Sequence, residues 1–244
     1  MESRPWVSFP MGLAQRTKGG AFVYSVFAAN DFQRIDERDD ATFYTAPRLV
    51  VHIDERAIGT IGTILGKCIP QNAEILDLMS SWRSHLPNGL HPEAVVGLGM
   101  NGTEMAENEQ LTSWMVRDLN SDPRLPFETA SFDVAINTVS VQYLTRPTEV
   151  FAEVRRVLRP GGRFIVIFSN RMFPTKAVRI WRESDEQGRL ALVRSYFQEA
   201  GGFTEIEASE HGTGSRTSSS PLQWLGMSGD PVYVVTARRA PHAL

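Results

Sequence analysis

Cysteine, long apolar runs and a leader pattern are the first features that this 244-residue sequence has little of. Cys68 is its one cysteine, so no intrachain disulfide can form, and a lone cysteine without metal-ligand spacing is typical of a small buried apolar residue. No apolar run approaches the roughly 20 residues that a membrane helix needs. Residues 1–5 lack the charged-then-apolar pattern of a secretory signal. We therefore expect a soluble protein of a reducing compartment, the cytoplasm, with no membrane partner.

An excess of one charge is also missing. The chain has 25 Lys and Arg residues against 28 Asp and Glu residues, a net charge of −3, which gives no electrostatic case for binding nucleic acid. His52 near Asp54, and His91 on its own, lack partners for a metal site, so we expect no metal. An apolar content of 42% is sufficient for the core of one large domain.

Glycine is missing at one informative place. Residues 73–78 form a short apolar run that is interrupted by Glu74 and closes around Asp77, which indicates a buried parallel strand. Such a strand delivers Asp77 to the carboxyl edge of a sheet, where ligands of open α/β sheets bind. The loop that follows reads Met-Ser-Ser-Trp-Arg, whereas nucleotide-binding folds usually keep glycines there. No G-x-G-x-x-G follows the strand, so a dinucleotide oxidoreductase is disfavoured, and a cofactor pocket of unusual construction is predicted.

Alternating strands and helices organise the chain from residue 47 onward. Apolar residues at helical spacing predict helices over 50–65, from 147 to a Pro-Gly-Gly stop at 160–162, and over 190–200. Short apolar runs predict further strands at 94–98, 114–118, 132–137, 163–168, 204–208 and 232–237. Because the last two have no helix between them, we expect them to pair antiparallel in an otherwise parallel sheet. Residues 1–46 are then an N-terminal extension and a candidate lid, and residues 47–244 are the domain.

Three segments carry a family resemblance: Leu-Pro-Phe at 125–127, Ser-Phe-Asp-Val at 131–134 and Val-Leu-Arg-Pro-Gly-Gly at 157–162. In this order they resemble the class I S-adenosylmethionine-dependent methyltransferases of the type 11 group. The loop Asp-Leu-Met-Ser-Ser-Trp at 77–82 is similar to that of a divergent branch. The resemblance implies a Rossmann-like, seven-stranded, mostly parallel sheet with helices on both faces and a C-terminal antiparallel hairpin. It also implies S-adenosylmethionine as the cofactor and methyl transfer to a small-molecule acceptor.

The resemblance places the amino-acid end of the cofactor after the first strand. Asp77 matches the family's acid there, and Ser80 and Ser81 would offer hydroxyl and backbone donors to the methionine carboxylate. A cap on a following helix is the competing role for Asp77. A rebuilt loop that binds the cofactor weakly or not at all is the competing interpretation of the two serines.

The ribose and adenine ends fall after the next strands. The ribose acid of the family is replaced here by Gly99, so Asn101 is the expected substitute, with a turn role for Asn101 equally open. Asp118 matches the acid that meets the adenine amino group, and the Leu119 backbone would meet the ring. A surface turn residue before Asn120 is the competing role for Asp118. Asn137 falls where the family lines the methyl-transfer cleft.

Substrate-side candidates gather at the same predicted edge. Arg83, Arg171 and Lys176 would suit an anionic group on the acceptor. Trp82 would stack on a planar acceptor or cover the sulfonium, although ordinary packing is the better single explanation for it. As proton acceptors we expect His85 and Tyr143. The missing glycines and ribose acid leave two alternatives open: a methyltransferase-like protein that binds a ligand or partner without methyl transfer, and a repurposed enzyme. The oligomeric state is not predicted.

Overall fold

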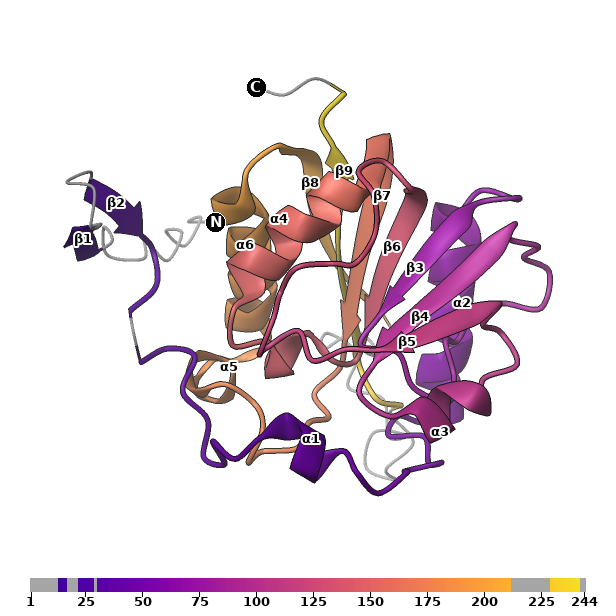
Figure 1. The fold of residues 1–244 in the computed structure, drawn as a ribbon, viewed down its shortest axis with the longest axis horizontal. Helices are drawn as coiled ribbons and strands as arrows, with labels where there is room; N and C mark the ends of the chain where they lie inside the picture. Colours follow the sequence, from indigo (N-terminus) through magenta and orange to yellow (C-terminus); the bar gives the residue numbers. More distant parts are fainter. Residues whose placement is uncertain (1–12, 17–21, 29, 212–228, 242–244) are drawn as a thin grey trace, which may run out of the picture.

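A seven-stranded sheet forms the centre of the protein (Figure 1). The structure, a computed structural model, describes residues 13–16, 22–28, 30–211 and 229–241. The strand order is β5-β4-β3-β6-β7-β9-β8. Neighbours from β5 to β7 pair parallel, and β9 pairs antiparallel with both β7 and β8. The strands are β3 (Glu74–Leu78), β4 (Ala94–Gly99), β5 (Ser113–Val116), β6 (Phe132–Thr138), β7 (Leu158–Phe168), β8 (Phe203–His211) and β9 (Val232–Arg239).

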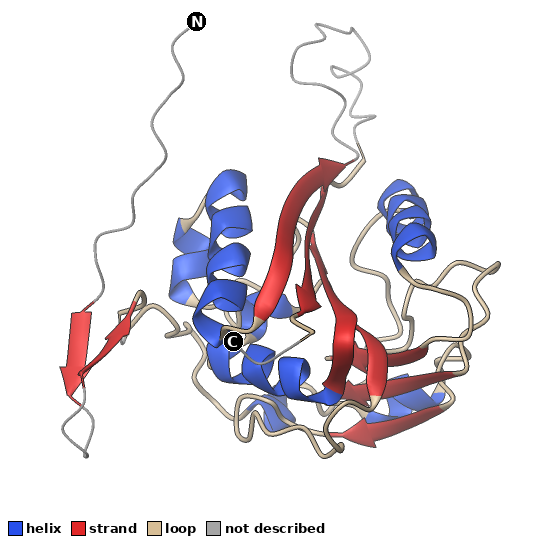
Figure 2. Ribbon diagram, turned by 90° about the horizontal axis from the view of Figure 1, so that it is seen from above, coloured by secondary structure: helices blue, strands red, loops and turns tan. Residues whose placement is uncertain are grey.

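Helices cover both faces of this sheet (Figure 2). One face carries α2 (Glu55–Cys68), and the other carries α4 (Pro147–Val157) and α6 (Glu186–Ala200). The predicted Rossmann-like sheet, its helices on two faces and its antiparallel C-terminal pair are thus confirmed. The remaining elements are β1 (Leu13–Arg16) and β2 (Phe22–Ser25), which pair with each other, and four short helical segments: α1 (Asp40–Phe43), α3 (Gly102–Ala106), η1 (Val141–Tyr143) and α5 (Arg179–Glu183).

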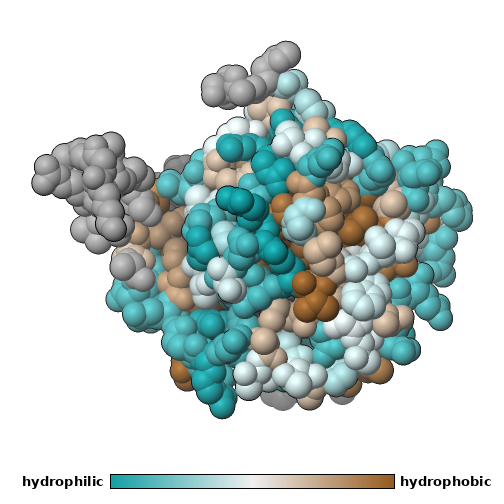
Figure 3. Space-filling view, viewed as in Figure 1, coloured by the Kyte–Doolittle hydropathy of each residue, from teal (hydrophilic) through white to brown (hydrophobic). Residues whose placement is uncertain are grey.

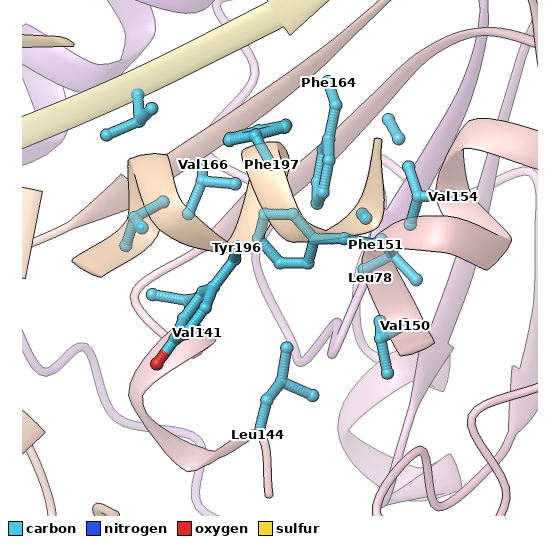
Figure 4. Packing of buried hydrophobic residues seen from close by; sticks show 14 of the residues in the cluster. Leu78, Val141, Leu144, Val150, Phe151, Val154, Phe164, Val166, Tyr196 and Phe197 are labelled. Carbon is cyan, nitrogen blue, oxygen red and sulfur yellow. The ribbon is translucent and has the colours of Figure 1, made fainter. Parts of the chain in front are cut away.

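Strand alternation divides the core into two clusters. In β3, Ile75 packs with the cluster under α2, while the next residue, Leu76, packs with the cluster under α4 and α6. Phe151 of α4 joins the helices to the sheet, because its ring lies 4.9 Å from that of Phe164 and 4.7 Å from that of Phe197 (Figure 4). Edge-to-face rings at this spacing fill the space between layers and fix the position of the strand ends.

The first long helix begins later than the apolar spacing predicts. Asp54 caps α2, since its carboxylate accepts a hydrogen bond from the backbone N–H of Ala57 at 2.8 Å. Residues 50–53 therefore stay non-helical, and Val50, which continues the helical apolar pattern, is 54% exposed. The predicted start at residue 50 was wrong because a side-chain cap outweighs apolar periodicity at a helix end.

Residues 30–53, which we call the strap, run along the carboxyl end of the sheet and include α1. Figure 1 shows α1, α3 and α5 at this same end. The strap is held by Lys176, whose fully buried ammonium lies 3.0 Å from the Asp40 carboxylate and donates to the carbonyl of Arg38 at 2.7 Å. Arg34 donates to both oxygens of Asp40 at 2.6 and 2.7 Å. The strap crosses residue 46, where the sequence placed the end of an extension.

The outer edge of the sheet is apolar. Figure 3, in the orientation of Figure 1, shows hydrophobic side chains at the surface in the region of β5. Trp114, Met115 and Val116 of β5 are 44%, 41% and 53% exposed. Within the described ranges, no helix combines the length and the apolar character needed to cross a bilayer.

Candidate functional site

A cavity of about 360 Å³ lies at the carboxyl ends of the parallel strands, between the sheet and the strap. Side chains from the strap and from the segments that follow β3, β4, β5, β6 and β7 form its wall. This is the edge at which an open α/β sheet binds its ligands. The polar and aromatic residues of the wall include Asp40, Tyr44, Arg48, His52, Asp77, Ser80, Ser81, Trp82, Arg83, His85, Asn101, Glu104, Arg117, Asp118, Asn120, Thr138, Ser140, Tyr143, Arg171 and Phe173.

Asp77, at the end of β3, anchors the loop that follows it. One carboxylate oxygen accepts hydrogen bonds from the hydroxyls of Ser80 at 2.7 Å and Ser84 at 2.6 Å, and the residue is only 3% exposed. Burial raises the pKa of Asp77 to about 6, although both serine hydrogen bonds act to lower it. A carboxylate held in this way fixes the loop, and its second oxygen keeps acceptor capacity.

The glycine that the loop lacks is found on the neighbouring strand. The loop lies directly on β4, because the Ser80 N–H donates to the Leu98 carbonyl at 2.9 Å. A Cβ at Gly99 would collide with the carbonyl oxygen of Ser80. Met79 takes the left-handed turn that a glycine would favour, with φ 56°. Close backbone approach is therefore retained by a glycine in β4, and no acidic side chain can occupy position 99.

Asn101 does not stand free in place of the missing ribose acid. Its side-chain oxygen caps α3 by accepting from the N–H groups of Thr103 and Glu104 at 3.0 and 3.1 Å. Its amide nitrogen donates to the Tyr44 carbonyl of the strap at 2.8 Å. The amide is thus already paired on both sides, so the structure gives Asn101 the capping role that the sequence left open, and the expected ribose contact lacks support.

Glu104 brings a carboxylate to the same corner, and sequence reasoning missed it. The residue is 7% exposed and accepts from the Ser81 hydroxyl at 2.6 Å and from the Arg48 N–H at 2.8 Å. The hydroxyl of Ser81 is therefore directed to Glu104, which leaves its backbone as the donor that a ligand would meet. The position of Glu104 one turn into α3, beyond the expected strand-end acid, explains why pattern matching did not find it.

Asp118 and Leu119 follow β5 at the far side of the cavity. One oxygen of Asp118 accepts from the N–H groups of Asn120 at 2.9 Å and Ser121 at 3.3 Å, which sets the side chain at the start of a turn. Asp118 is half-buried, and Leu119 is 3% exposed, so a carboxylate and an apolar wall lie together. A purine with an exocyclic amino group fits such a corner.

Among the described residues, four of the nine buried side-chain atoms without a hydrogen-bond partner belong to residues that line the cavity, and a fifth belongs to Asn137, which is not part of the wall. An unsatisfied buried donor or acceptor costs about 1–3 kcal/mol, so such atoms indicate where a ligand or water binds. Asn137 is 2% exposed, and its amide donates to the Leu78 carbonyl at 3.3 Å while its oxygen has no partner. Further such atoms belong to Arg48, Arg117, Thr138 and Ser140, which all line the cavity.

Comparison with known proteins adds to this geometry. Residues 91–166 match the family model described as a methyltransferase domain. Malonyl-[acyl-carrier protein] O-methyltransferase of Hahella chejuensis is 33% identical over 102 residues, which cover 39% of this chain and 36% of that protein. The ubiquinone/menaquinone biosynthesis C-methyltransferase UbiE of a Ruegeria species is 38% identical over 69 residues, which cover 27% and 26%. The middle of this chain is therefore similar to a methyltransferase domain.

Solved structures agree on the fold of this chain. A methyltransferase solved in complex with the Haloferax volcanii Trm112 methyltransferase activator matches with a TM-score of 0.54 at 16% identity, covering 78% of this chain and 92% of that one. The [4+2]-cyclase SpnF matches with a TM-score of 0.51 at 15% identity, covering 83% and 91%. The first curated relatives are matched over 36% of their length or less. S-adenosylmethionine is the cofactor of the family, and the Asp118–Leu119 corner and the unpaired polar atoms fit it.

Both residues that the sequence offered as proton acceptors, His85 and Tyr143, lie on the cavity wall. Burial, and then the charge of Arg83, lowers the pKa of His85 to about 4, so its imidazole is neutral near pH 7. The Tyr143 hydroxyl accepts from the Phe173 N–H at 2.8 Å, and burial raises its pKa. His52, which sequence reasoning discarded as a metal ligand, is a third neutral base here, since burial and then Arg48 lower its pKa. Within the described residues no group of three potential metal ligands occurs.

The expected substrate-binding residues separate into two groups. Trp82, Arg83 and Arg171 line the cavity; the Arg83 guanidinium lies 4.4 Å from the Trp82 ring centroid, and Arg171 pairs with Asp230 at 2.9 Å. Lys176 is fully buried under the strap and is not part of the wall. Its position therefore corrects the expectation of a substrate contact, because its charge is already engaged by Asp40.

The strap supplies residues that sequence reasoning did not select, namely Asp40, Tyr44 and Arg48. They precede the first long helix, and the helical pattern that wrongly included Val50 and Ile53 hid the fact that this stretch runs along the sheet edge. The dense run of aromatic and charged residues from 40 to 52 was the available signal.

Proposed function

We propose that this protein transfers the methyl group of S-adenosylmethionine to a small-molecule acceptor. The observation that carries the proposal is the single cavity wall that joins the Asp118–Leu119 corner, the loop anchored on Asp77 and the strap of the described chain. The sulfonium methyl of the bound cofactor is already activated. The protein's task is then to align donor and acceptor and to exclude water.

Each end of the cavity has a residue for one part of this task. Asp118 would accept from the adenine amino group, with Leu119 against the ring, and the backbone of the Ser80–Ser81 loop would face the methionine carboxylate. The strap covers the cavity from outside, and its neutral His52 faces the same space as His85 and Tyr143. His52 or His85, whose imidazoles are neutral, would take the proton of an acceptor hydroxyl, amine or activated carbon. Tyr143, whose raised pKa keeps its hydroxyl protonated, could only donate a hydrogen bond there.

The names of the relatives point to different methyl acceptors, so they do not identify the acceptor of this chain. One is named for O-methylation of a malonyl group on a carrier protein, and another for C-methylation in quinone biosynthesis. Because the fold also occurs in a protein named as a cyclase, fold alone does not assign methyl transfer. We infer a small acceptor with an anionic group, because Arg48 and Arg83 line the cavity without an ion pair among the described residues; nucleic acid is disfavoured by the net charge of −3.

A turnover assay tests the proposal. The protein is incubated with S-adenosylmethionine and a small-molecule fraction of its source cells, and S-adenosylhomocysteine is measured together with product masses. We expect S-adenosylhomocysteine to accumulate and one metabolite to gain about 14 mass units. Cofactor binding without S-adenosylhomocysteine formation would favour the alternative, a ligand-binding or repurposed protein, for which the sealed Asp77 and the blocked position 99 are the supporting observations.

A further inference from the structure

Four arginines line the cavity, and they differ in what neutralises them. Arg117 pairs with Asp122 at 2.5 Å, and Arg171 pairs with Asp230 at 2.9 Å. Arg83 is exposed to solvent, where water stabilises its charge. Arg48 is partly buried and forms no ion pair within the described part of the chain.

The guanidinium of Arg48 lies among aromatic rings. It is 4.4 Å from the ring centroid of Phe43, 5.6 Å from that of Phe173 and 5.8 Å from that of Tyr44. Stacking on ring faces fixes its plane and leaves its N–H groups pointing along that plane. One of them, Nη2, donates to the Phe43 carbonyl at 2.9 Å, whereas Nη1 is buried without an acceptor. The side chain is therefore held in a fixed orientation, and one of its two terminal nitrogens lacks a hydrogen-bond acceptor.

Two carboxylates of the same cavity wall already have hydrogen-bond partners. Glu104 takes the backbone N–H of Arg48 and the hydroxyl of Ser81. Asp40 is neutralised by Arg34 and Lys176. The charge of Arg48 is felt in the cavity, since it contributes to the lowered pKa of His52. An anion on the ligand would complete this arrangement.

We propose that Arg48 binds a carboxylate of the acceptor, an inference that rests on the proposed function and names its substrate class. A planar carboxylate matches a planar guanidinium in a two-point contact. A phosphate would bring a second negative charge into a cavity that already holds Asp77, Glu104 and Asp118, which disfavours it. The rings of Tyr44 and Phe173 line the cavity beside Arg48 and give apolar surface for the body of the acceptor. Arg48, rather than Arg83 or Arg171, then sets acceptor specificity.

Calorimetric titration of the protein saturated with S-adenosylhomocysteine tests this inference with three probes: benzoate, its neutral analogue benzamide, and phenyl phosphate. We expect benzoate to bind at least tenfold more tightly than benzamide and more tightly than phenyl phosphate. Arg48→Met should remove the preference for benzoate, and Arg48→Lys should retain part of it, because an ammonium keeps the charge without the planar two-point contact. Arg146→Met is the control: Arg146 is an exposed arginine paired with Glu149, and this variant should keep the full preference.

Equal affinity for benzoate and benzamide, tighter binding of phenyl phosphate, or an unchanged preference in Arg48→Met would overturn the inference. Thermal melting is recorded for every variant, and if Arg48→Met does not fold, the probe comparison in the wild type and in Arg48→Lys decides. The titration with S-adenosylhomocysteine comes first and is scored separately. Failure at that step counts against the proposed function, whereas its success without a benzoate preference counts against the role of Arg48 alone.

Discussion

Asp77 and Asp118 are both acids at the ends of parallel strands in one cavity, yet their surroundings give them different roles. Asp77 is 3% exposed, and two serine hydroxyls seal one of its oxygens. Asp118 is half-buried and is held by backbone N–H groups of its own turn. A strand-end acid is placed by the fold, but its partners decide whether it anchors a loop or meets a ligand. Asp77 has the partners of a loop anchor, and we propose that Asp118 is the acid that meets a ligand.

The neighbouring strand explains why Asp77 and Asp118 have different surroundings. Gly99 of β4 admits the carbonyl of Ser80, so the loop after β3 lies flat against the sheet and brings its serines to Asp77. The turn after β5 has no such constraint, and Asp118 stays on the cavity wall. Four substitutions test this difference between the two acids.

Gly99→Ala should have the largest effect. A new Cβ would meet the Ser80 carbonyl, which is backbone and cannot rotate away, so we expect a loss of about 3 kcal/mol in the free energy of unfolding. Chemical denaturation measures it. Gly59→Ala is the matched control, because a Cβ there meets nothing within 4 Å and alanine favours a helix interior; it should be neutral or stabilising by up to about 1 kcal/mol. Equal stability of the two variants would contradict the proposed packing of the loop on β4.

Asp77→Asn should change the pH dependence of stability. The pKa of Asp77 is about 6 in the folded protein and is raised from its ordinary value of 3.8. Between these values the folded state binds a proton that the unfolded state lacks, so the contribution of Asp77 to stability is fully present below about pH 4 and is lost as pH rises through about 6. The loss is about 2–3 kcal/mol.

The measurement is the difference in unfolding free energy between wild type and Asp77→Asn at pH 4, 5, 6, 7 and 8. Asparagine keeps the shape and carries no titrating charge, so the variant should gain relative stability as pH rises. If the difference in unfolding free energy between wild type and Asp77→Asn did not change with pH, Asp77 would not be sealed from water as described.

Asp118→Asn should act on the cofactor. Asparagine can still accept the turn's N–H groups through its side-chain oxygen, so folding should be retained. Loss of a charged acceptor for the adenine amino group should weaken S-adenosylhomocysteine binding about tenfold, equivalent to about 1.4 kcal/mol. Calorimetry measures the affinity, and an unchanged value would remove Asp118 from the cofactor site.

Ser84→Ala should have the smallest effect. It removes one of the two hydroxyls from Asp77 and should cost about 1 kcal/mol of stability. Because the Ser84 hydrogen bond lowers the pKa of Asp77, its loss should also move the midpoint of the pH effect upward. A midpoint that stays in place would mean that the hydroxyl does not stabilise the carboxylate.

The sequence predicted the sheet and its antiparallel pair because each strand is a local apolar run, and it predicted where Asp77 and Asp118 fall. It could not predict the strap, whose position depends on contacts between distant residues such as the Asn101 amide and the Tyr44 carbonyl. Arg48 was missed for the same reason, since its surroundings of Phe43 and Phe173 form only in the folded chain. Lys176 was assigned to substrate because sequence position alone does not report burial.

The proposed function requires a cavity that still accepts the cofactor, although serines and the large side chains of Trp82 and Arg83 follow β3 where the family keeps glycines. Calorimetric titration of the wild-type protein with S-adenosylhomocysteine tests it most directly. We predict saturable binding at one site per chain, with a dissociation constant well below millimolar. If the titration gave no binding heat up to a millimolar concentration of S-adenosylhomocysteine, the cavity would not be a cofactor site.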